Sequence, residues 1–74
     1  MSLIEILNKL KWHEKYDFNK VIIWYINRPD GVNCIRGEQI KKIGKKFLET
    51  EGKYIPYHRI IKIEYEGEII YKKS

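Results

Sequence analysis

A single cysteine, Cys34, in a chain of only 74 residues limits the possible folds more than any other feature of this sequence. A domain this small buries a modest core and commonly needs disulfides or a metal ion for stability. One cysteine excludes an internal disulfide, and one cysteine with two histidines argues against a structural zinc site. The fold must therefore rest on packing, for which the chain supplies fourteen Ile, two Trp, two Phe and six Tyr.

The charge of the chain favours a polyanionic partner. Fifteen basic residues outnumber ten acidic ones, giving a formal net charge of +5, and basic side chains that neutralise phosphates release bound counterions. Twelve of the fifteen are lysines, however, which are also the usual solubilising residues of a protein surface. The excess alone is therefore compatible with nucleic-acid binding or with solubility.

Neither a targeting segment nor a membrane span is indicated. The longest apolar run covers residues 21–26, far short of the roughly 20 residues of a transmembrane helix, and no small-residue cleavage site follows the apolar N-terminus. We expect one cytoplasmic domain over residues 1–74, with no membrane partner, no cofactor and no metal. The sequence does not indicate the oligomeric state.

The first part of the chain predicts a helix followed by a strand. Ser2 and Glu5 have the spacing of a capping box, and apolar residues then recur at helical spacing up to about Lys11, at positions 3, 6, 7 and 10. Residues 20–27 are apolar on both faces, which is typical of a central strand.

A turn, a short strand and a second helix are predicted next. Residues 28–31 contain a proline and a glycine that favour chain reversal, and residues 32–36 then fit a short strand. We expect a short helix from residue 37 or 38 to about residue 44, with Ile40 and Ile43 facing inward.

Strands dominate the remainder of the chain. Glu66-Gly67 fits a two-residue hairpin turn that places Ile63 opposite Ile70 and Lys62 opposite Tyr71. The strands are expected at residues 46–51, 59–66 and 68–72. The predicted fold class is α+β: a small antiparallel sheet of four to five strands, with one longer N-terminal helix and one short helix.

The segment richest in chemistry spans residues 55–60 and reads Ile-Pro-Tyr-His-Arg-Ile. The Arg59 guanidinium is a planar fork suited to phosphate oxygens, and the His58 imidazole can donate to the same anion or move a proton near neutral pH. The pair predicts a phosphate-binding site.

Structural roles for the same two residues stay open. In an extended chain His58 and Arg59 point to opposite faces, so both can grip one phosphate only if Pro56 introduces a bend. His58 can also be a surface imidazole bonded to a carboxylate. Arg59 can lie at the rim of the core or pair with an internal partner.

Arg36, Gly37 and Glu38 form a second candidate anion site. If the second helix starts here, its free amides point toward Arg36, and Gly37 lets the backbone approach a ligand closely. The alternative is that Gly37 only eases a turn, while Arg36 pairs with Glu38 or Glu64.

A catalytic alternative uses both histidines. His58, with His13 or a lysine, has the groups for metal-independent cleavage of RNA by general acid–base catalysis. The sequence gives no reason to place His13 beside His58, and it contains no Gly-rich phosphate loop, Ser-His-Asp set or carboxylate cluster for a metal.

Exposed aromatic rings offer a further route to nucleic acid, because unpaired bases stack on them. Most aromatic residues of a small domain are needed in its core. We expect one or two of them to be exposed, with Tyr57 first because it neighbours His58; the other candidates are Trp24, Tyr25, Tyr54, Tyr65 and Tyr71.

The order of these motifs resembles a known family. They are Leu-Lys-Trp at residues 10–12, Tyr-Asp-Phe at 16–18, Val-x-x-Trp-Tyr-Ile at 21–26, Ile-Arg-Gly at 35–37, Ile-Pro-Tyr-His-Arg-Ile at 55–60 and Glu-Tyr-x-Gly-Glu at 64–68. Over residues 3–71 the chain resembles the small archaeal family described as an RNA cyclic-group end-recognition domain. That family also occurs as a module in eukaryotic proteins.

The resemblance implies a non-enzymatic domain that recognises RNA ends bearing a cyclic phosphate, in association with RNA-end-processing enzymes. Arg36 matches the first motif, and His58 and Arg59 match the second. On this interpretation Arg36 and the amides after Gly37 hold the phosphate, Arg59 adds a second cationic contact, His58 donates to an oxygen and Tyr57 stacks on the terminal base.

Lysines supply the rest of the expected attraction to an RNA 3′ end. They act independently of sequence, and we expect them to be Lys41, Lys42, Lys45 and Lys46. The two alternatives are a small metal-independent RNA phosphoesterase or ribonuclease that uses His58, and a protein-interaction adaptor whose motifs are structural.

Overall fold

Short strands make up most of the protein. The computed structural model describes residues 2–28 and 31–73, and within these residues it contains one α-helix, α1 (Leu3–Trp12). The strands are β1 (Val21–Asn27), β2 (Gly31–Arg36), β3 (Ile40–Ile43), β4 (Phe47–Thr50), β5 (Lys53–Pro56), β6 (Ile60–Tyr65) and β7 (Glu68–Lys72). Single 3-10 turns lie between them: η1 (Phe18–Lys20), η2 (Gly37–Gln39) and η3 (Tyr57–Arg59).

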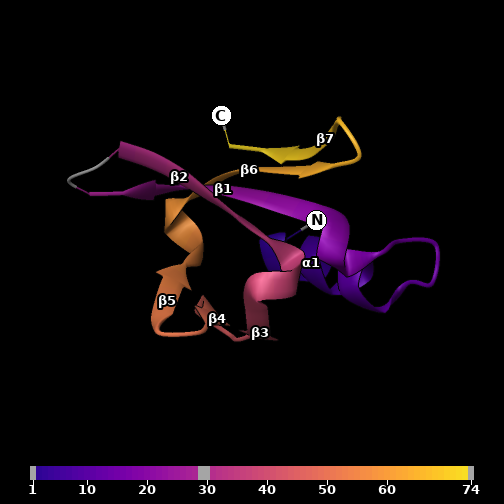
Figure 1. The fold of residues 1–74 in the computed structure, drawn as a ribbon, viewed down its shortest axis with the longest axis horizontal. Helices are drawn as coiled ribbons and strands as arrows, with labels where there is room; N and C mark the ends of the chain where they lie inside the picture. The colour runs from indigo at the N-terminus through magenta and orange to yellow at the C-terminus, as the bar shows by residue number, and fades with distance from the viewer. Residues whose placement is uncertain (1, 29–30, 74) are drawn as a thin grey trace.

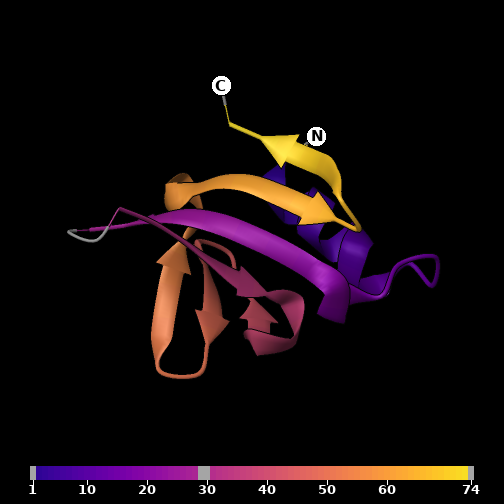
Figure 2. The same cartoon turned by 45° about the horizontal axis from the view of Figure 1, so that its top comes forward.

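The strands form two antiparallel sheets. One has the order β2-β1-β6-β7 and the other has the order β3-β4-β5. Both α1 and the three-stranded sheet lie on the same side of the four-stranded sheet (Figures 1 and 2). One core lies between these layers, formed by Leu7, Leu10, Val21, Ile23, Tyr25, Ile35, Ile40, Leu48, Ile55, Ile60 and Ile63.

The predicted α+β fold class is wrong. We expected one sheet of four to five strands with a longer and a shorter helix. The described part of the chain instead has one α-helix and two sheets, of four and three strands. The residues assigned to the second helix form the turn η2 and the strand β3, which pairs with β4.

A β-bulge accounts for the error in β3. Ile40 pairs with Thr50 and Lys42 pairs with Glu49, so Lys41 is an extra residue on this strand. In a regular strand, residues three apart point to opposite faces. The extra residue brings Ile43 to the same side as Ile40, and both contact the core. Residues three apart also share one face of a helix. The sequence pattern alone therefore does not distinguish a bulged strand from a helix.

The predicted helix start and central strand are confirmed. The Ser2 hydroxyl accepts the Glu5 N–H at 3.2 Å, and Glu5 Oε1 accepts the Ser2 N–H at 3.4 Å, which completes the capping box. Strand β1 lies between β2 and β6 and pairs antiparallel with both. Its alternate residues Val21, Ile23 and Tyr25 are buried.

The two predicted turns have different outcomes. Pro29 and Asp30 lie outside the described residues, while the strands on either side of them pair as far as Asn27 and Gly31. The predicted turn at Glu66-Gly67 is confirmed. Both of its residues have positive φ, 48° and 84°, as a type I′ hairpin turn requires.

The predicted register of the last hairpin is wrong beyond its first pairs. Ile63 lies opposite Tyr71 and Lys62 opposite Lys72, one position away from the expected partners. An irregularity between Ile63 and Glu64 causes the shift.

The helix of the described residues has no membrane-spanning character. Neither its length nor its apolar content reaches what a crossing of the bilayer requires.

Candidate nucleic-acid interface

The turn η3 gives the His-Arg pair its position. Pro56 ends β5 with φ −61°, and the chain then makes one 3-10 turn in which the Ile60 N–H bonds to the Tyr57 carbonyl. This turn is the bend that sharing one ligand requires, because it breaks the strict alternation of an extended chain. His58 and Arg59 are both exposed and line the same hollow.

A third basic residue joins them from a distant part of the sequence. Arg28, directly after β1, lines this hollow of about 310 Å³ with Ile26, His58 and Arg59. We call it the basic hollow. The sequence patterns gave Arg28 no role, although it is one of only three arginines in the chain. A basic residue at the end of a central strand was the one feature of the sequence that could have indicated a role for Arg28. Which residues surround Arg28, however, depends on the pairing of β1 with β6.

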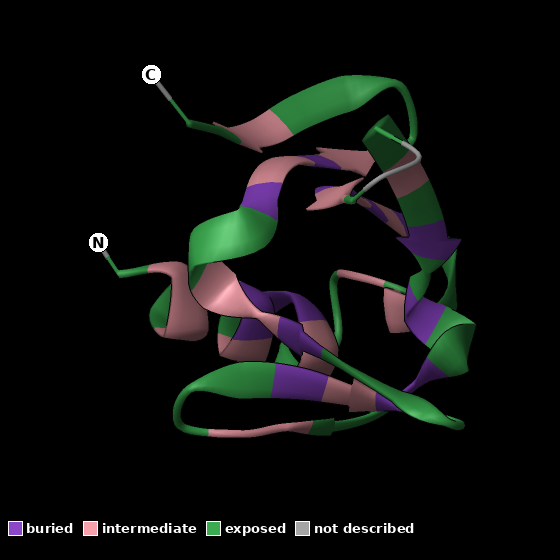
Figure 3. Ribbon diagram, turned by 90° about the vertical axis from the view of Figure 1, so that its left-hand side faces the viewer, coloured by how far each residue is buried: buried purple, intermediate pink, exposed green. Residues whose placement is uncertain are grey.

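The basic hollow lacks nearby negative charge in the described part of the chain. Among residues 2–28 and 31–73, no carboxylate lies within 4.0 Å of the charged groups of Arg28, His58 or Arg59; the two ion pairs found are Arg36–Glu38 and Lys62–Glu64. The alternative for His58, an imidazole bonded to a carboxylate, is likewise not found among these residues. Figure 3 views this end of the molecule, with η3 as an exposed turn between β5 and β6.

Further lysines border η3. The Tyr57 N–H donates to the Lys46 carbonyl at 3.2 Å, which places the turn between β3 and β4 beside η3. Lys45 and Lys46 are exposed on that turn. From the other side, Lys73 Nζ donates to the His58 carbonyl at 2.7 Å. The positive surface therefore extends beyond the basic hollow itself.

Tyr57 supports η3 from inside. Its side chain is half-buried, its hydroxyl donates to the Gly44 carbonyl, and burial raises the pKa of its phenol above the usual value. The prediction that Tyr57 would be the exposed aromatic is wrong, because its ring packs against the core.

Two exposed aromatic residues lie on the hairpin formed by β4 and β5, next to η3. Tyr54 is 61% exposed and Phe47 is 39% exposed, and their ring centroids are 4.8 Å apart at an interplanar angle of 66°. The signal in the sequence was the alternation of the short β4–β5 hairpin, in which Leu48 and Ile55 pair and face inward.

Arg36 and Gly37 lie away from the basic hollow. Arg36 pairs with Ile22 on β1, six residues from Arg28, which corresponds to about 20 Å along a strand. Its backbone N–H donates to Gln39 Oε1 at 2.9 Å, and its guanidinium lies 3.9 Å from Glu38. The arrangement matches the alternative in which Arg36 pairs with Glu38.

Gly37 has a packing role in this structure. It is buried, and a Cβ at this position would lie 1.8 Å from the Phe18 carbonyl oxygen. The turn η2 has only three helical residues and is not the start of an α-helix, so the helix N-terminus expected here is not formed.

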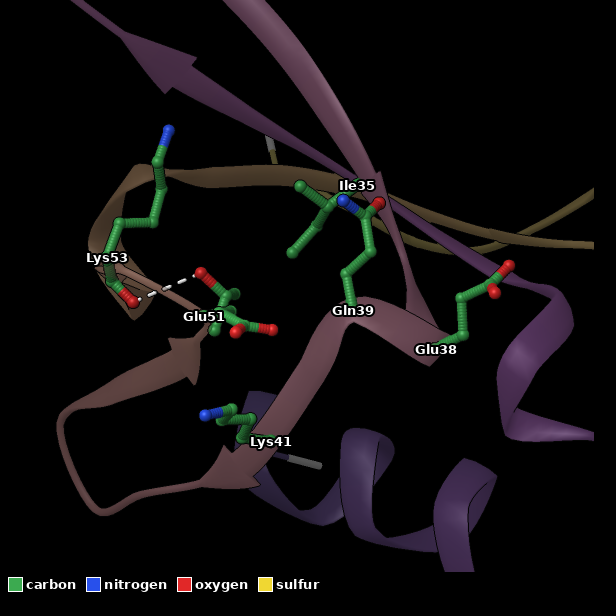
Figure 4. A pocket seen from close by; sticks show the side chains of 7 residues that line it. Ile35, Glu38, Gln39, Lys41, Glu51 and Lys53 are labelled. Atoms are coloured by element: carbon green, nitrogen blue, oxygen red, sulfur yellow. Dashed lines mark hydrogen bonds between the residues drawn. The ribbon is translucent and has the colours of Figure 1, made fainter.

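Lys41 and Lys42, on β3, have glutamates as neighbours. Lys42 pairs with Glu49 across β3 and β4. Lys41 lines another hollow, of about 440 Å³, with Glu38 and Glu51 (Figure 4). Its other lining residues are Ile35, Gln39, Thr50 and Lys53. Two lysines face two glutamates there, so this larger hollow offers an anion little net attraction.

The two histidines are not brought together. His13 is the C-cap of α1 and lines a hollow with Trp12 and Glu14, whereas His58 lines the basic hollow. The loop after α1 lies at one end of the long axis, and the turn η3 lies in the other half of the molecule, below β1 and β2 (Figure 1). No group of three or more His, Cys, Asp or Glu residues suited to a metal ion is found among the described residues.

Comparison with known proteins identifies relatives along nearly the full chain. Residues 1–73 match the family model described as the MJ1316 RNA cyclic group end recognition domain. A UPF0248 protein from Archaeoglobus fulgidus is 41% identical over 68 residues, which cover 90% of this chain and 99% of that protein. A UPF0248 protein from Methanocaldococcus jannaschii is 37% identical over 77 residues, covering 97% and 94%. No solved structure matches this one.

Proposed function

This chain belongs to the family of MJ1316 RNA cyclic group end recognition domains, and from this membership we propose that it binds RNA through a phosphate at the end of the strand. The phosphate occupies the basic hollow. The observation that carries the proposal is the gathering of Arg28, His58 and Arg59, from two distant segments, around one open hollow.

The three basic side chains supply complementary contacts. The guanidinium groups of Arg28 and Arg59 are planar forks that match pairs of phosphate oxygens. The imidazole of His58 donates a hydrogen bond to a phosphate or ribose oxygen. Tyr57, fixed to the Gly44 carbonyl, holds η3 in place while these contacts form.

Charge alone does not select a cyclic phosphate. A linear terminal phosphate carries about −1.5 to −2 charges at pH 7, whereas a cyclic phosphodiester carries one, so Coulomb attraction favours the linear end. Ile26 gives the basic hollow one apolar wall. The less strongly charged ring of the cyclic end fits this wall at a lower cost of desolvation. We expect this difference to favour the cyclic end.

The RNA behind the terminal phosphate is held without regard to its sequence. Lys45 and Lys46, beside η3, attract the phosphates that follow, and Lys73 adds charge on the other side. Weak sequence preference and strong salt dependence follow from this arrangement.

The proposal is one of binding rather than catalysis. Acid–base cleavage of RNA uses two proton-transfer groups, and the basic hollow has one imidazole beside two guanidinium groups, which are hydrogen-bond donors without an acceptor. Chemistry at the bound end is therefore assigned to a separate RNA-end-processing enzyme.

The test is a fluorescence-anisotropy titration with short single-stranded RNAs that differ only at the 3′ end. The ends are a 2′,3′-cyclic phosphate, a linear 3′-phosphate and a hydroxyl. We expect both phosphate ends to bind more tightly than the hydroxyl, with the cyclic end tightest. Arg28→Ala and Arg59→Ala should each weaken binding of the phosphate ends by about 10- to 100-fold, since each removes a charged hydrogen-bond donor.

Arg36→Ala is the matched control. It removes the same side chain from an exposed position outside the basic hollow, and its affinity should stay near that of the wild type. Equal affinity for all three ends, or equal losses in Arg36→Ala and Arg59→Ala, would contradict the proposal. No RNA binding at all would favour the protein-interaction adaptor instead.

A further inference from the structure

One tyrosine is exposed although the core of so small a protein needs its aromatics. All six tyrosines lie in the described part of the chain, and five of them are buried or half-buried. Tyr54 is 61% exposed. An aromatic ring left in water forgoes a large apolar burial, and such rings on protein surfaces commonly contact ligands or partners.

The ring of Tyr54 is held in a defined place. Leu48 and Ile55 pair across β4 and β5 and face the core, and the rings of Phe47 and Tyr54 lie outside them in an edge-to-face arrangement. Phe47 therefore supports Tyr54. A supported ring loses little conformational freedom when a flat partner stacks on it.

Tyr54 adjoins the proposed phosphate site. It lines a hollow of about 190 Å³ that shares Ile26 and Arg59 with the basic hollow. Lys53 and Asn27 also line this second hollow, adding a cation and an amide that both donates and accepts hydrogen bonds. A group stacked on Tyr54 can therefore belong to the same ligand as the phosphate at Arg59.

The other candidate rings lack this position. Trp12 is 74% exposed, but it lines a hollow with Glu14 at the end of α1. Trp24 is half-buried, its indole N–H donates to Glu64, and the Lys62 ammonium lies 4.9 Å from the ring centroid. Only Tyr54 among these three combines exposure with a neighbouring arginine of the basic hollow.

We infer that Tyr54 stacks on the base of the terminal nucleotide, so that the ligand is an unpaired 3′ end of single-stranded RNA. This inference rests on the proposed function for the position of the phosphate. Every base has a π face, so stacking tolerates any base. A blunt duplex is excluded as a good ligand, because its terminal base is already stacked and paired.

The experiment compares RNAs that keep the end phosphate but differ at the terminal base. Single-stranded oligonucleotides ending in a cyclic phosphate carry either a base or an abasic ribose at the last position, and the base-bearing strand is also tested as a blunt duplex. Removal of the stacking ring in Tyr54→Ala should weaken binding of the base-bearing strand by about 5- to 150-fold. It should leave the abasic strand nearly unchanged.

Two variants act as controls. Tyr54→Phe keeps the ring and should bind like the wild type, and Trp12→Ala removes an exposed aromatic from the other end of the molecule without effect. Wild-type affinity of Tyr54→Ala for the base-bearing strand, or equal binding of base-bearing and abasic strands by the wild type, would overturn the inference.

The inference and the proposed function fail in distinguishable ways. The same strands are also prepared with a 3′-hydroxyl. If the phosphate site is wrong but Tyr54 stacks, the wild type will not distinguish the two ends, while Tyr54→Ala still loses affinity for unpaired bases. If the phosphate site is right but Tyr54 does not stack on the base, the wild type will bind the phosphate end more tightly than the hydroxyl end. Tyr54→Ala will then bind like the wild type.

Discussion

At the scale of single residues, adjacent positions of η3 have opposite roles. Tyr57 faces inward, where its N–H donates to the Lys46 carbonyl at 3.2 Å and its hydroxyl donates to the Gly44 carbonyl. His58 and Arg59 remain exposed at the basic hollow. One half-buried phenol thus joins η3 to the turn between β3 and β4 and fixes where His58 and Arg59 point.

The alkaline stability of the protein should report on Tyr57. Burial raises the pKa of this phenol above its ordinary value of 10.0, so folding favours the protonated form. The corresponding stability is complete below the pKa of the unfolded state and is lost as the pH rises through the folded-state pKa. We expect the free energy of unfolding of the wild type to fall more steeply above pH 10.0 than that of Tyr57→Phe, which has no phenol here.

Urea denaturation at pH values on both sides of the phenol pKa measures this effect. At neutral pH, Tyr57→Phe should be less stable by about 1 kcal/mol, because the Gly44 carbonyl loses its donor. Tyr54→Phe is the matched control, since that side chain is exposed. Parallel curves for the wild type and Tyr57→Phe would contradict the burial of the Tyr57 phenol.

At the scale of elements, the close contact between η1 and η2 depends on a glycine, Gly37, which has no side chain. The backbone of Phe18 lies directly over Gly37, and a Cβ there would meet the Phe18 carbonyl oxygen at 1.8 Å and its carbon at 2.8 Å. Backbone atoms cannot rotate away as the end of a side chain can. The two turns must separate to admit even one methyl group.

Gly37→Ala should therefore destabilise the fold by about 2–3 kcal/mol, as overpacking does in other cores. Thermal unfolding measures the loss. Gly52→Ala is the comparison: its φ of +87° disfavours alanine, but nothing lies within 4 Å of the added carbon, so the loss should be near 1 kcal/mol. Below its melting temperature, Gly37→Ala should still bind RNA like the wild type. A selective loss of RNA binding would instead assign Gly37 to the ligand site.

Elements set by local signals were predictable from the sequence, and those set by bulges were not. The Ser2–Glu5 capping box and the apolar run of β1 act within a few residues and were identified correctly. In β6, Trp24 pairs with Lys62 and Tyr25 with Ile60, so the residue between them is extra. Ile60 and Ile63 are both fully buried as a result, whereas the strict alternation of a regular strand would place Ile61 on the same face as Ile63.

The candidate site could be predicted from the sequence only in part, because it joins segments that are far apart in the chain. The sequence predicts a phosphate-binding role for His58 and Arg59 because these two residues are adjacent in the chain. Arg28 joins them only through the pairing of β1 with β6, and no local pattern indicates a contact between segments some thirty residues apart in this chain. Arg36 has the same guanidinium group, yet it lies beside Ile22, at the other end of β1 from Arg28.

At the scale of the whole molecule, the proposed RNA surface lies around η3, away from one end of an elongated shape. The protein measures 36 × 24 × 21 Å along its principal axes. The loop after α1 lies at one end of the long axis, and the turn η3 lies in the other half of the molecule (Figure 1). The basic hollow includes η3 residues, and the lysines of the turn between β3 and β4 lie beside η3. Position, and not only net charge, should then govern RNA affinity.

Charge reversal at the two ends separates these effects. Lys45→Glu with Lys46→Glu and Lys15→Glu with Lys20→Glu each lower the formal charge of +5 by four, and all four lysines are exposed. Only the first pair borders η3. Each lost phosphate contact reduces the salt dependence of single-strand binding by about 0.7 in the slope of log K against log salt, so the first variant should show a slope shallower by about 1.4.

The measurement is the affinity for one cyclic-phosphate RNA over a range of salt concentrations. The Lys15→Glu/Lys20→Glu variant should keep the wild-type slope, with a modest loss of affinity at low salt because long-range attraction depends on total charge. That loss should vanish near physiological salt, where the Debye length of about 8 Å is much shorter than the molecule. If both double variants lose the same affinity at every salt concentration, the attraction comes from net charge alone, and the surface around η3 has no special part in binding RNA.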